Sequence, residues 1–350
     1  MTYILGIETS CDETAAAVVI DGTTIASNII ASQIDLHAQY GGVFPEAASR
    51  AHVEAIGLVV EESMRDAGID FNRVDAIAVT RGPGLVGSLL VGINYAKGLA
   101  LASGKPLLGI NHLEGHVYSL WLTQPYREVR FPVVVLLVSG GHTELLLMRD
   151  HGDYERLGGT LDDAAGEAFD KVGRMLGLPF PGGPNIERAA MHGNSAAYDF
   201  PRAMLRDDSY DFSFSGLKTA VMREATVSSG LRRGEKGMQV RSDISVNDVA
   251  ASFQRAVISV LAEKTVRAAN EHKATEILLA GGVSANQALR LAIRQSSELP
   301  VRYPPLNLCT DNGAMIAAAA YYRLQNGLKD DLFALDARPM WPLNNETYMG

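Results

Sequence analysis

The sequence predicts an α/β protein built from two similar halves. Runs that are typical of strands alternate with runs of helical periodicity. A strand, a tight polar turn and a second strand at residues 3–20 recur in kind at 131–148, although few letters are shared. The 350 residues, of which 47% are hydrophobic, are enough for two cores. We therefore expect a duplicated, layered fold with parallel strands.

The first half is expected to open with an antiparallel meander. Apolar and β-branched runs at 3–9, 15–20 and 23–31 predict three strands, and the turn-forming SCDE separates the first two. A helix is expected from Pro45 to Ala67, because apolar residues recur at helical spacing and Gly68 ends the pattern. Those apolar residues are Val53, Ile56, Val60 and Met64.

A βαβ unit is expected to complete the first half. The apolar run 76–80 predicts a strand, RGPG predicts a turn, and 88–104 predicts a helix that Ser88 opens. The run 106–110 predicts the next strand. Because a helix joins the two strands, we expect them to lie parallel in one sheet.

The second half begins near Phe131 and is richer in helices. After its strand–turn–strand motif, helical sequence is expected from 162 to about 270. A strand at 276–283, a helix from Asn286 and a terminal helix at 311–327 follow. The charge-mixed stretch 223–243 is typical of a loop.

These elements predict two lobes. The first lobe is expected to span 1–131, and the segment from about 325 to 350 is a candidate to return to it. The second lobe is expected to span 132–324 and to carry a helical insertion.

Composition narrows the classes of function. The apolar runs VVVLLV and AMIAAAAYY are shorter than the roughly 18–20 residues of a membrane-spanning helix, and the start of the chain lacks a basic region and a cleavage site. The cysteines Cys11 and Cys309 form no CxxC pair, which fits a reducing compartment. We expect a cytoplasmic protein with no membrane segment. A net charge of -9 argues against binding nucleic acid through bulk charge alone.

Three glycine-rich or polar turns follow predicted strands. They are SCDE at 10–13, SGGH at 139–142 and AGGVSAN at 280–286. Such turns expose backbone N–H groups that suit a phosphate, and SGGH is the best candidate, although each turn alone is also typical of a plain hairpin. Taken together, the turns resemble those of the actin, Hsp70 and sugar-kinase superfold. That resemblance implies two lobes around a nucleotide cleft.

The motif NHLEGH at 111–116 is a candidate metal site. Asn111 is a good helix N-cap, and on a helix His112 and His116 project from one face, where both imidazoles can bind one ion. A core or solvated histidine pair is the alternative. In HExxH metalloproteases the glutamate follows the first histidine directly, whereas Glu114 stands two positions on and is expected to face away. The protease arrangement is therefore absent.

Three acidic residues are candidates to complete this site. Asp311 precedes the terminal helix and is a possible third metal ligand, although a helix N-cap is its simpler interpretation. Asp12 and Glu13 are expected at the tip of the first turn. One of them is a candidate catalytic base, and the alternative is that both are ordinary solvated turn residues. Asp170 and Glu187 are candidates to bind ribose hydroxyls, and a surface helix explains them equally well.

Many motifs, in colinear order, resemble the TsaD family. They cover the chain from Ile4 to about Leu324 and include GIETSCDETAAAVV, HAQYGGVFPEAASRAHV, GINHLEGHVY, LVSGGHTELL, FSFSGLKTAV and CTDNGAMIA. The set as a whole is specific to that family. The resemblance implies transfer of threonylcarbamoyl from threonylcarbamoyl-AMP to N6 of the adenosine 3′ of the anticodon in tRNAs that read codons beginning with A. Glycoprotease is an older name of the family, and the HxExH order disfavours it.

The resemblance also implies roles for single residues. It makes His112, His116 and Asp311 the ligands of one divalent metal, Fe²⁺ first and Zn²⁺ second, and Asp12 and Glu13 the acids needed for activity. It places the adenylated substrate at Leu137, Val138, Ser139, Gly140, Gly141, Asp170, Gly183, Glu187 and Asn286. Many family members carry aspartate at the position of Glu187.

Partners follow from the same resemblance. It implies a TsaB-like paralogue that pairs through the N-terminal lobe, a TsaE-like ATPase, and a TsaC-like enzyme that supplies the adenylate. We expect tRNA to meet a composite surface that includes Arg232, Arg233, Lys236 and Arg241, which are otherwise charges of a solvated loop. An ATPase or kinase of the same superfold, a non-catalytic scaffold and, last, a metallopeptidase remain the alternatives.

Overall fold

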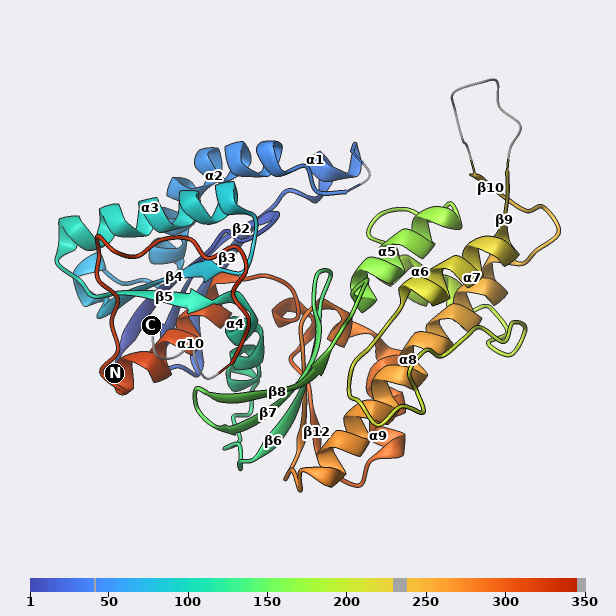
Figure 1. Cartoon of the computed structure of the whole chain (residues 1–350). Helices are drawn as coiled ribbons and strands as arrows, with labels where there is room; N and C mark the ends of the chain where they lie inside the picture. Colours follow the sequence, from blue (N-terminus) through green and yellow to red (C-terminus); the bar gives the residue numbers. More distant parts are fainter. Residues whose placement is uncertain (41, 229–237, 345–350) are drawn as a thin grey trace. The chain divides into compact units, whose positions relative to one another are not determined.

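The computed structural model describes residues 1–40, 42–228 and 238–344, in two compact units (Figure 1). Unit 1 comprises Met1–Val129, Met148–Glu155 and Pro304–Gly350, and unit 2 comprises Arg130–Leu147 and Arg156–Tyr303. Each unit contains a five-stranded sheet.

The sheet of unit 1 has the strand order β3-β2-β1-β4-β5. Pairing of β1 with β2 and of β2 with β3 is antiparallel, whereas β1 with β4 and β4 with β5 are parallel. The expected meander and βαβ unit are therefore both present. The strands are β1 (Tyr3–Glu8), β2 (Glu13–Ile20), β3 (Thr24–Ser32), β4 (Ala76–Gly82) and β5 (Leu107–Asn111).

Helices cover both faces of this sheet. The helices of unit 1 are α1 (Ile34–Ala38), α2 (Pro45–Asp66), α3 (Val86–Ser103), α4 (His112–Tyr118) and α10 (Gly313–Gln325). Leu5 and Ile7 of β1 pack into the core with residues of α2 and α3. Gly6, between them, points to the opposite face, because successive residues of a strand alternate. A Cβ on Gly6 would lie 2.3 Å from the Gly313 carbonyl oxygen of α10, so a glycine is required there.

Two details of these helices differ from the predictions. Helix α3 begins at Val86 with Leu85 as its N-cap, and Ser88 is buried inside the helix. The expected opening at Ser88 is therefore wrong; the backbone carbonyl of Ser88 accepts a hydrogen bond from Thr9 Oγ1 (2.9 Å) within the core. In α2, Val53 faces outward although it fits the apolar periodicity.

Helix α3 is long and apolar enough to cross a membrane, judged by its length and composition alone. It packs against α2 and β4 of unit 1. Core helices of soluble proteins pass the same test, so this feature is only a weak indication of a membrane span.

The sheet of unit 2 has the order β12-β11-β6-β7-β8. Read from β8, this is the same order of first, second and third strands as in unit 1, followed by two later strands. Strand β11 is parallel to both β6 and β12. The strands are β6 (Val133–Val138), β7 (Thr143–Asp150), β8 (Asp153–Gly159), β11 (Ile277–Ala280) and β12 (Val301–Arg302). The helices are α5 (Ala165–Met175), α6 (Gly182–Ala190), α7 (Ser215–Ala225), α8 (Val246–Glu271) and α9 (Gln287–Ser296).

The stretch 223–243 contains more regular structure than expected. Helix α7 continues to Ala225, and the short strands β9 (Thr226–Ser228) and β10 (Met238–Val240) pair antiparallel. The expectation of a loop is therefore wrong for these parts, and residues 229–237 lie outside the described residues.

The division into units departs from the expected lobes mainly at the C-terminal end. The chain returns to unit 1 at Pro304, rather than at about 325, because α10 packs on β1, β2 and α4. The terminal helix therefore belongs with the N-terminal sheet. The hairpin end 148–155 also groups with unit 1.

Candidate metal centre and glycine turns

The metal-site candidate begins at the end of β5. Asn111 caps α4, because its side-chain oxygen accepts hydrogen bonds from the N–H groups of Leu113 (2.9 Å) and Glu114 (3.4 Å). His116 follows His112 by four positions, so both imidazoles lie on one side of the helix, with ring centroids 4.7 Å apart. Both side chains are buried.

Asp311 meets this histidine pair from another part of unit 1. Its Oδ1 lies 3.1 Å from His116 Nε2 and 3.5 Å from His112 Nε2. Ligand atoms of the three residues all lie within 4.8 Å of one another. The N-cap of α10 is Asn312, whose Oδ1 accepts from the Met315 N–H (3.0 Å). Asp311 is thus not needed as the cap, which was its simpler interpretation.

A second layer of polar groups orients His112. Its Nδ1 lies 3.1 Å from Glu8 Oε2 and 3.1 Å from Ser10 Oγ. Glu8 also accepts hydrogen bonds from the Ser10 N–H and the Thr80 hydroxyl, both at 2.5 Å. A carboxylate behind a histidine fixes the ring and increases its basicity as a ligand.

Negative charge accumulates around these residues. Burial opposes protonation of His112, but Asp311 and Glu8 outweigh it and raise the pKa of the imidazole to about 9. Burial, followed by the charges of Asp311 and Asp12, raises the pKa of Glu13 to about 9. The same three influences, burial first, raise the pKa of the Cys11 thiol. At His112 the charges of Asp311 and Glu8 therefore outweigh burial, which favours a positive charge at this position.

The donor set fits a divalent transition metal. Two imidazole nitrogens and one carboxylate oxygen are suitable ligands for such an ion and leave further positions open. The buried Nδ1 of His116 has no hydrogen-bond partner among the described residues. The three residues are therefore a possible metal centre.

Glu114 does not join this centre. Its carboxylate is buried and lies 3.4 Å from the hydroxyl of Tyr154, which donates to it. Burial raises its pKa to about 7, although Arg323 acts in the opposite direction. The interpretation of Glu114 as pointing away from the ligand pair agrees with these contacts.

Asp12 lies in the turn between β1 and β2, and Glu13 is the first residue of β2; both belong to the same unit as the metal ligands. The Asp12 carbonyl accepts a hydrogen bond from the Gln33 N–H (3.0 Å), and Glu13 Oε1 accepts one from Ser32 Oγ (3.4 Å). Ser10, two residues before Asp12, lies 3.1 Å from His112 Nδ1 through its hydroxyl, so this segment lies next to the candidate metal centre.

The SGGH turn of unit 2 joins β6 to β7 and is tied to helix α5. The Ser139 N–H donates to the His142 carbonyl (2.8 Å), and Ser139 Oγ accepts from the His142 N–H (3.2 Å). A Cβ built on Gly140 or Gly141 would meet no atom within 4 Å. Packing within the chain does not require these glycines, so the open space above them fits a close-approaching ligand.

The AGGVSAN turn follows the neighbouring parallel strand. Because Ala280 of β11 pairs with Leu137 of β6, both turns stand at the same edge of the sheet, where ligands of α/β proteins bind. Gly281 has φ +85°, and a Cβ there would lie 2.4 Å from the Val138 carbonyl oxygen. This glycine is therefore structural.

The other expected substrate residues connect the helices around this edge. Asp170 Oδ1 accepts from the Gly182 N–H at the start of α6 (2.7 Å). Glu187 Oε1 accepts from the Gln287 N–H at the start of α9 (2.7 Å). Asn286 caps α9 through the Leu289 N–H (3.0 Å) and donates to Gln254 Oε1 (2.8 Å).

Each of these three side chains therefore has a role in holding unit 2 together. Gly183, at the start of α6, differs from them, since a Cβ there would meet nothing within 4 Å. The expected substrate residues thus form one connected set in unit 2, and the expected metal ligands form another in unit 1.

The residues that contact the metal ligands or the segment of Asp12 were not predicted from the sequence. Glu8, Ser10 and Thr80 contact each other or His112, and His52 lies under the Asp12 turn. A glutamate ending the otherwise apolar strand YILGIE was a signal for Glu8. For His52 and Thr80 the sequence offers no local signal, because their partners are distant along the chain.

Known proteins with similar sequences indicate the family of this chain. The model of the family "TsaD: tRNA N6-adenosine threonylcarbamoyltransferase" matches residues 24–318. A protein of that name from Thermomicrobium roseum is 58% identical over 360 residues, covering 99% of this chain and 98% of the relative. Another, from Geobacillus kaustophilus, is 54% identical and covers 97% of each chain.

Solved structures of other proteins share the fold. HypF from T. kodakarensis matches with a TM-score of 0.59 and 14% identity, over 93% of this chain and 48% of its own. Component A of the (R)-2-hydroxyglutaryl-CoA dehydratase of Acidaminococcus fermentans matches with a TM-score of 0.51 and 16% identity, over 93% and 100%. The duplicated fold is thus the actin, Hsp70 and sugar-kinase fold. Together, the family match and the near-complete relatives show that this chain belongs to the TsaD family.

Proposed function

We propose that this protein transfers the threonylcarbamoyl group of threonylcarbamoyl-AMP to N6 of the adenosine 3′ of the anticodon, in tRNAs that read codons beginning with A. The observation that carries the proposal is the His112, His116 and Asp311 cluster, found in a chain 58% identical to a protein named for this transfer. A kinase or ATPase of the same fold gives no reason for that cluster.

The reaction needs polarisation and proton removal. Attack of N6 on the carbamoyl carbon forms a C–N bond, breaks the bond to the phosphate oxygen, and releases AMP. A divalent ion, when bound, would supply positive charge to carbamoyl or phosphate oxygens. We assign removal of the N6 proton to the acids Asp12 and Glu13, because Ser10, two residues before Asp12, contacts the candidate ligand His112 (3.1 Å).

The metal is proposed to be Fe²⁺, with Zn²⁺ as the alternative. His112 and His116 would each offer an imidazole nitrogen, and Asp311 a carboxylate oxygen, a mixture that both ions accept. Glu8 would hold the ring of His112 through Nδ1.

The phosphate of the adenylate is assigned to the glycine turn of unit 2. Space above Gly140 and Gly141 admits a group close to the backbone, and the turn stands at the carboxyl end of β6. Leu137 and Val138 are fully buried at the end of β6 and lead directly into Ser139. Asp170, Gly183, Glu187 and Asn286 lie around the neighbouring helix starts.

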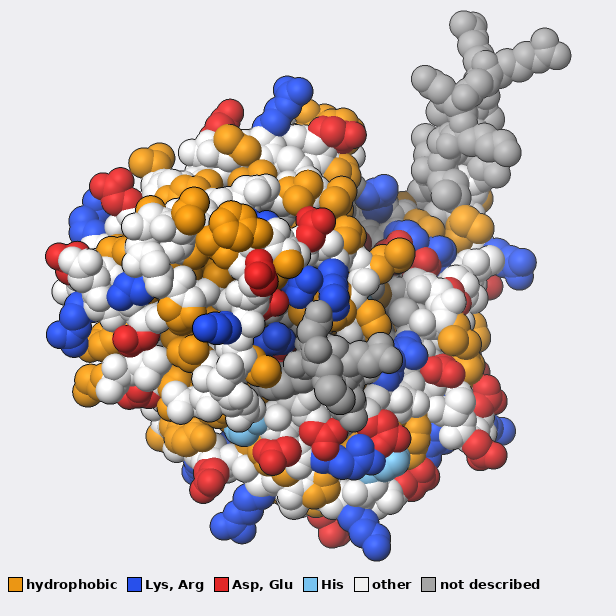
Figure 2. Space-filling model, turned by 60° about the vertical axis from the view of Figure 1, so that its left-hand side comes forward, with side chains coloured by type: hydrophobic (Ala, Val, Ile, Leu, Met, Phe, Trp, Pro, Cys, Tyr) orange, Lys and Arg blue, Asp and Glu red, His pale blue; other side chains and the backbone are white. Residues whose placement is uncertain are grey.

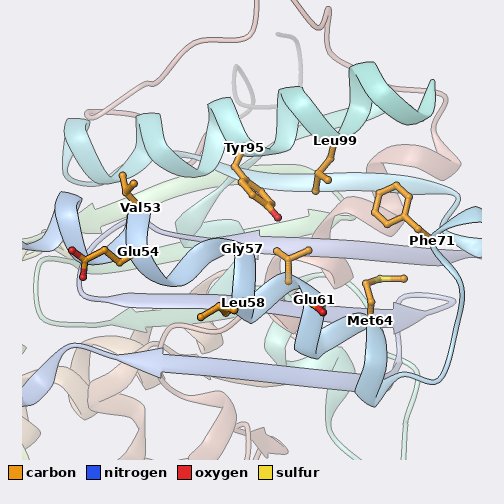
Figure 3. A pocket seen from close by; sticks show the side chains of 10 residues that line it. Val53, Glu54, Gly57, Leu58, Glu61, Met64, Phe71, Tyr95 and Leu99 are labelled. Carbon is orange, nitrogen blue, oxygen red and sulfur yellow. The ribbon is translucent and has the colours of Figure 1, made fainter.

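A TsaB-like paralogue is the proposed partner of unit 1. A groove of about 620 Å³ lies at α2 and α3, and Figure 3 shows side chains that line it, among them Val53, Leu58, Tyr95 and Leu99. Hydrophobic side chains are numerous on the face of unit 1 that Figure 2 turns forward. Exposed apolar patches of this kind mark protein interfaces.

The remaining partners are proposed from the family. A TsaC-like enzyme would make the adenylate, and a TsaE-like ATPase would act with the complex. Of the basic residues expected to meet tRNA, Arg241 pairs with Asp243, with 2.6 Å between Arg241 Nη2 and Asp243 Oδ2. Arg232, Arg233 and Lys236 lie outside the described residues. Because tRNA is the proposed substrate, we place the protein in the cytoplasm.

A reconstituted reaction tests the proposal. Purified protein, the three partner proteins, tRNA, ATP, bicarbonate and labelled threonine should give labelled tRNA, and His112→Ala should abolish labelling without unfolding the chain. The Thermomicrobium roseum relative, assayed in parallel, is the positive control. Labelling by the relative but not by this chain would contradict the proposal.

A further inference from the structure

A buried histidine of helix α2 holds the turn that carries Asp12 and Glu13. His52 Nε2 lies 3.0 Å from the Cys11 carbonyl oxygen, and His52 Nδ1 lies 2.7 Å from Thr14 Oγ1. His52 is fully buried and Thr14 is 1% exposed. One imidazole therefore contacts the residues on either side of the two acids, Cys11 before them and Thr14 after them.

The hydrogen-bond partners fix which nitrogen of His52 carries the proton. A carbonyl oxygen only accepts, so Nε2 must donate to Cys11, and in the neutral ring Nδ1 is then an acceptor. Nδ1 faces two donors, the Thr14 hydroxyl at 2.7 Å and Gln33 Nε2 at 3.4 Å. Burial also lowers the pKa of His52, in agreement with a neutral ring.

The same direction of donation continues beyond His52. Gln33 Oε1 lies 3.1 Å from His37 Nε2, and His37 Nδ1 accepts from the Phe44 N–H (3.3 Å). Each nitrogen and oxygen in this buried chain thus has a partner of the opposite kind. In addition, the Gln33 N–H donates to the Asp12 carbonyl (3.0 Å), so the network holds a second point of the turn.

Packing alone does not explain a histidine at this position. A buried polar ring is costly unless each of its polar atoms is bonded, and an aliphatic side chain would fill the space between helix and sheet without that requirement. Here the bonds of His52 go to the turn, rather than to the rest of α2.

We propose that His52 is a positioning residue for the transfer reaction, which fixes the β1–β2 turn so that Asp12 and Glu13 keep the geometry needed to take the N6 proton. This inference rests on the proposed function, since it assigns His52 to the carboxylates of that site. His52 itself touches neither substrate nor metal ligands in this assignment.

Two substitutions separate positioning from packing. His52→Leu keeps a similar volume and removes both hydrogen bonds, whereas the amide nitrogen of Gln in His52→Gln can still donate to the Cys11 carbonyl. We expect His52→Leu to lower kcat about ten- to a hundredfold, with KM for the adenylate and metal content unchanged, because small misplacements of catalytic groups have effects of this size. His52→Gln should retain most of kcat.

Ser63→Ala is the matched control. Ser63 is a fully buried polar residue of the same helix, and its hydroxyl bonds to Ser27 Oγ (2.8 Å) on β3, away from the turn. It should change stability without changing kcat. If His52→Leu does not fold, Thr14→Val tests the same contact, and Thr14→Ser should restore kcat.

A double substitution tests the route of the effect. If His52 acts through the turn, Glu13→Gln added to His52→Leu should lower kcat by much less than the product of the two single effects. Multiplicative effects, or a kcat for folded His52→Leu within twofold of the unmodified protein, would overturn the proposal.

Hydrogen exchange gives a measurement that does not need activity. The amide of Gln33 should exchange at least tenfold faster in His52→Leu than in the unmodified protein, and Ser63→Ala should leave it unchanged. Unchanged exchange at Gln33 in folded His52→Leu contradicts the positioning role. A failure of the unmodified protein to label tRNA would instead contradict the proposed function, and the exchange result would still stand separately.

Discussion

Among the residues that contact the candidate metal ligands, Glu8 is expected to have the clearest effect on metal affinity. Its carboxylate holds His112 Nδ1 at 3.1 Å and accepts from Ser10 and Thr80, so that the imidazole has one orientation. We expect Glu8→Gln to weaken metal affinity roughly 10- to 100-fold, the usual effect of losing such a partner. Titration with a competing chelator measures this affinity.

The matched control for Glu8 is Glu114→Gln. Glu114 is equally buried and belongs to α4 itself, but it contacts Tyr154 rather than a metal ligand. Its substitution should leave metal affinity unchanged. An equal loss in both variants would mean that general destabilisation, rather than orientation of His112, explains the effect.

His151 gives a pH dependence of stability. Burial lowers its pKa to about 4, and its ring stacks on Tyr322 with centroids 3.8 Å apart. Because the unfolded chain binds this proton near the ordinary value of about 6.5, the contribution of His151 is full above pH 6.5 and is lost as pH falls toward 4. His151→Phe keeps the stacking and should remove this part of the pH dependence in urea unfolding. An unchanged slope between pH 6.5 and 4 would contradict it.

At the scale of elements, Asn111 connects helix α4 to the C-terminal segment. Its amide nitrogen donates to the Trp341 carbonyl (3.1 Å), while its oxygen caps the helix that carries both histidines. Asn111→Ala should lower the free energy of unfolding by about 1–3 kcal/mol and also weaken metal binding, because the helix start loses its anchor. Urea unfolding and chelator competition measure the two effects.

Asn286→Ala provides the comparison for this prediction. Asn286 caps α9 of unit 2 in the same way, through the Leu289 N–H (3.0 Å). It should cost similar stability without any change in metal affinity. Unaltered metal affinity in Asn111→Ala would show that the cap does not determine the ligand geometry.

At the scale of the whole molecule, the groove between α2 and α3 should decide the association with the paralogue. Leu58 lines the groove and is 69% exposed, so Leu58→Asp changes the surface without disturbing a core. It should abolish co-elution with the TsaB-like protein. Leu291→Asp, at an exposed leucine of α9 in unit 2, should not. Equal association of both variants would exclude the groove as the interface.

The sequence predicted most elements because their signals are local. Asn111 as a cap, the spacing of His112 and His116, and the glycine turn at 139–142 all follow from neighbouring residues, and the structure contains each of them. The outward direction of Val53 in α2 could not be predicted, since periodicity marks an apolar stripe but not what covers it.

Contacts between residues that are far apart in the sequence were harder to predict. The return of the chain to unit 1 at Pro304 depends on α10 packing closely beside Gly6, a contact between residues about 300 positions apart. Glu8 and His52 were missed for the same reason, because their partners come from other elements. The resemblance to the family supplied Asp311 as a ligand, whereas its sequence context favoured a helix cap that Asn312 provides instead.

We propose that His112, His116 and Asp311 together serve the transfer of a threonylcarbamoyl group to tRNA. The most direct measurement is single-turnover transfer from preformed threonylcarbamoyl-AMP, with the metal-loaded protein, its TsaB-like and TsaE-like partners and tRNA. We predict labelled tRNA and one AMP released per transfer, with Asp311→Asn folded but reduced at least a hundredfold. Transfer by folded Asp311→Asn at the rate of the unmodified protein would contradict the account.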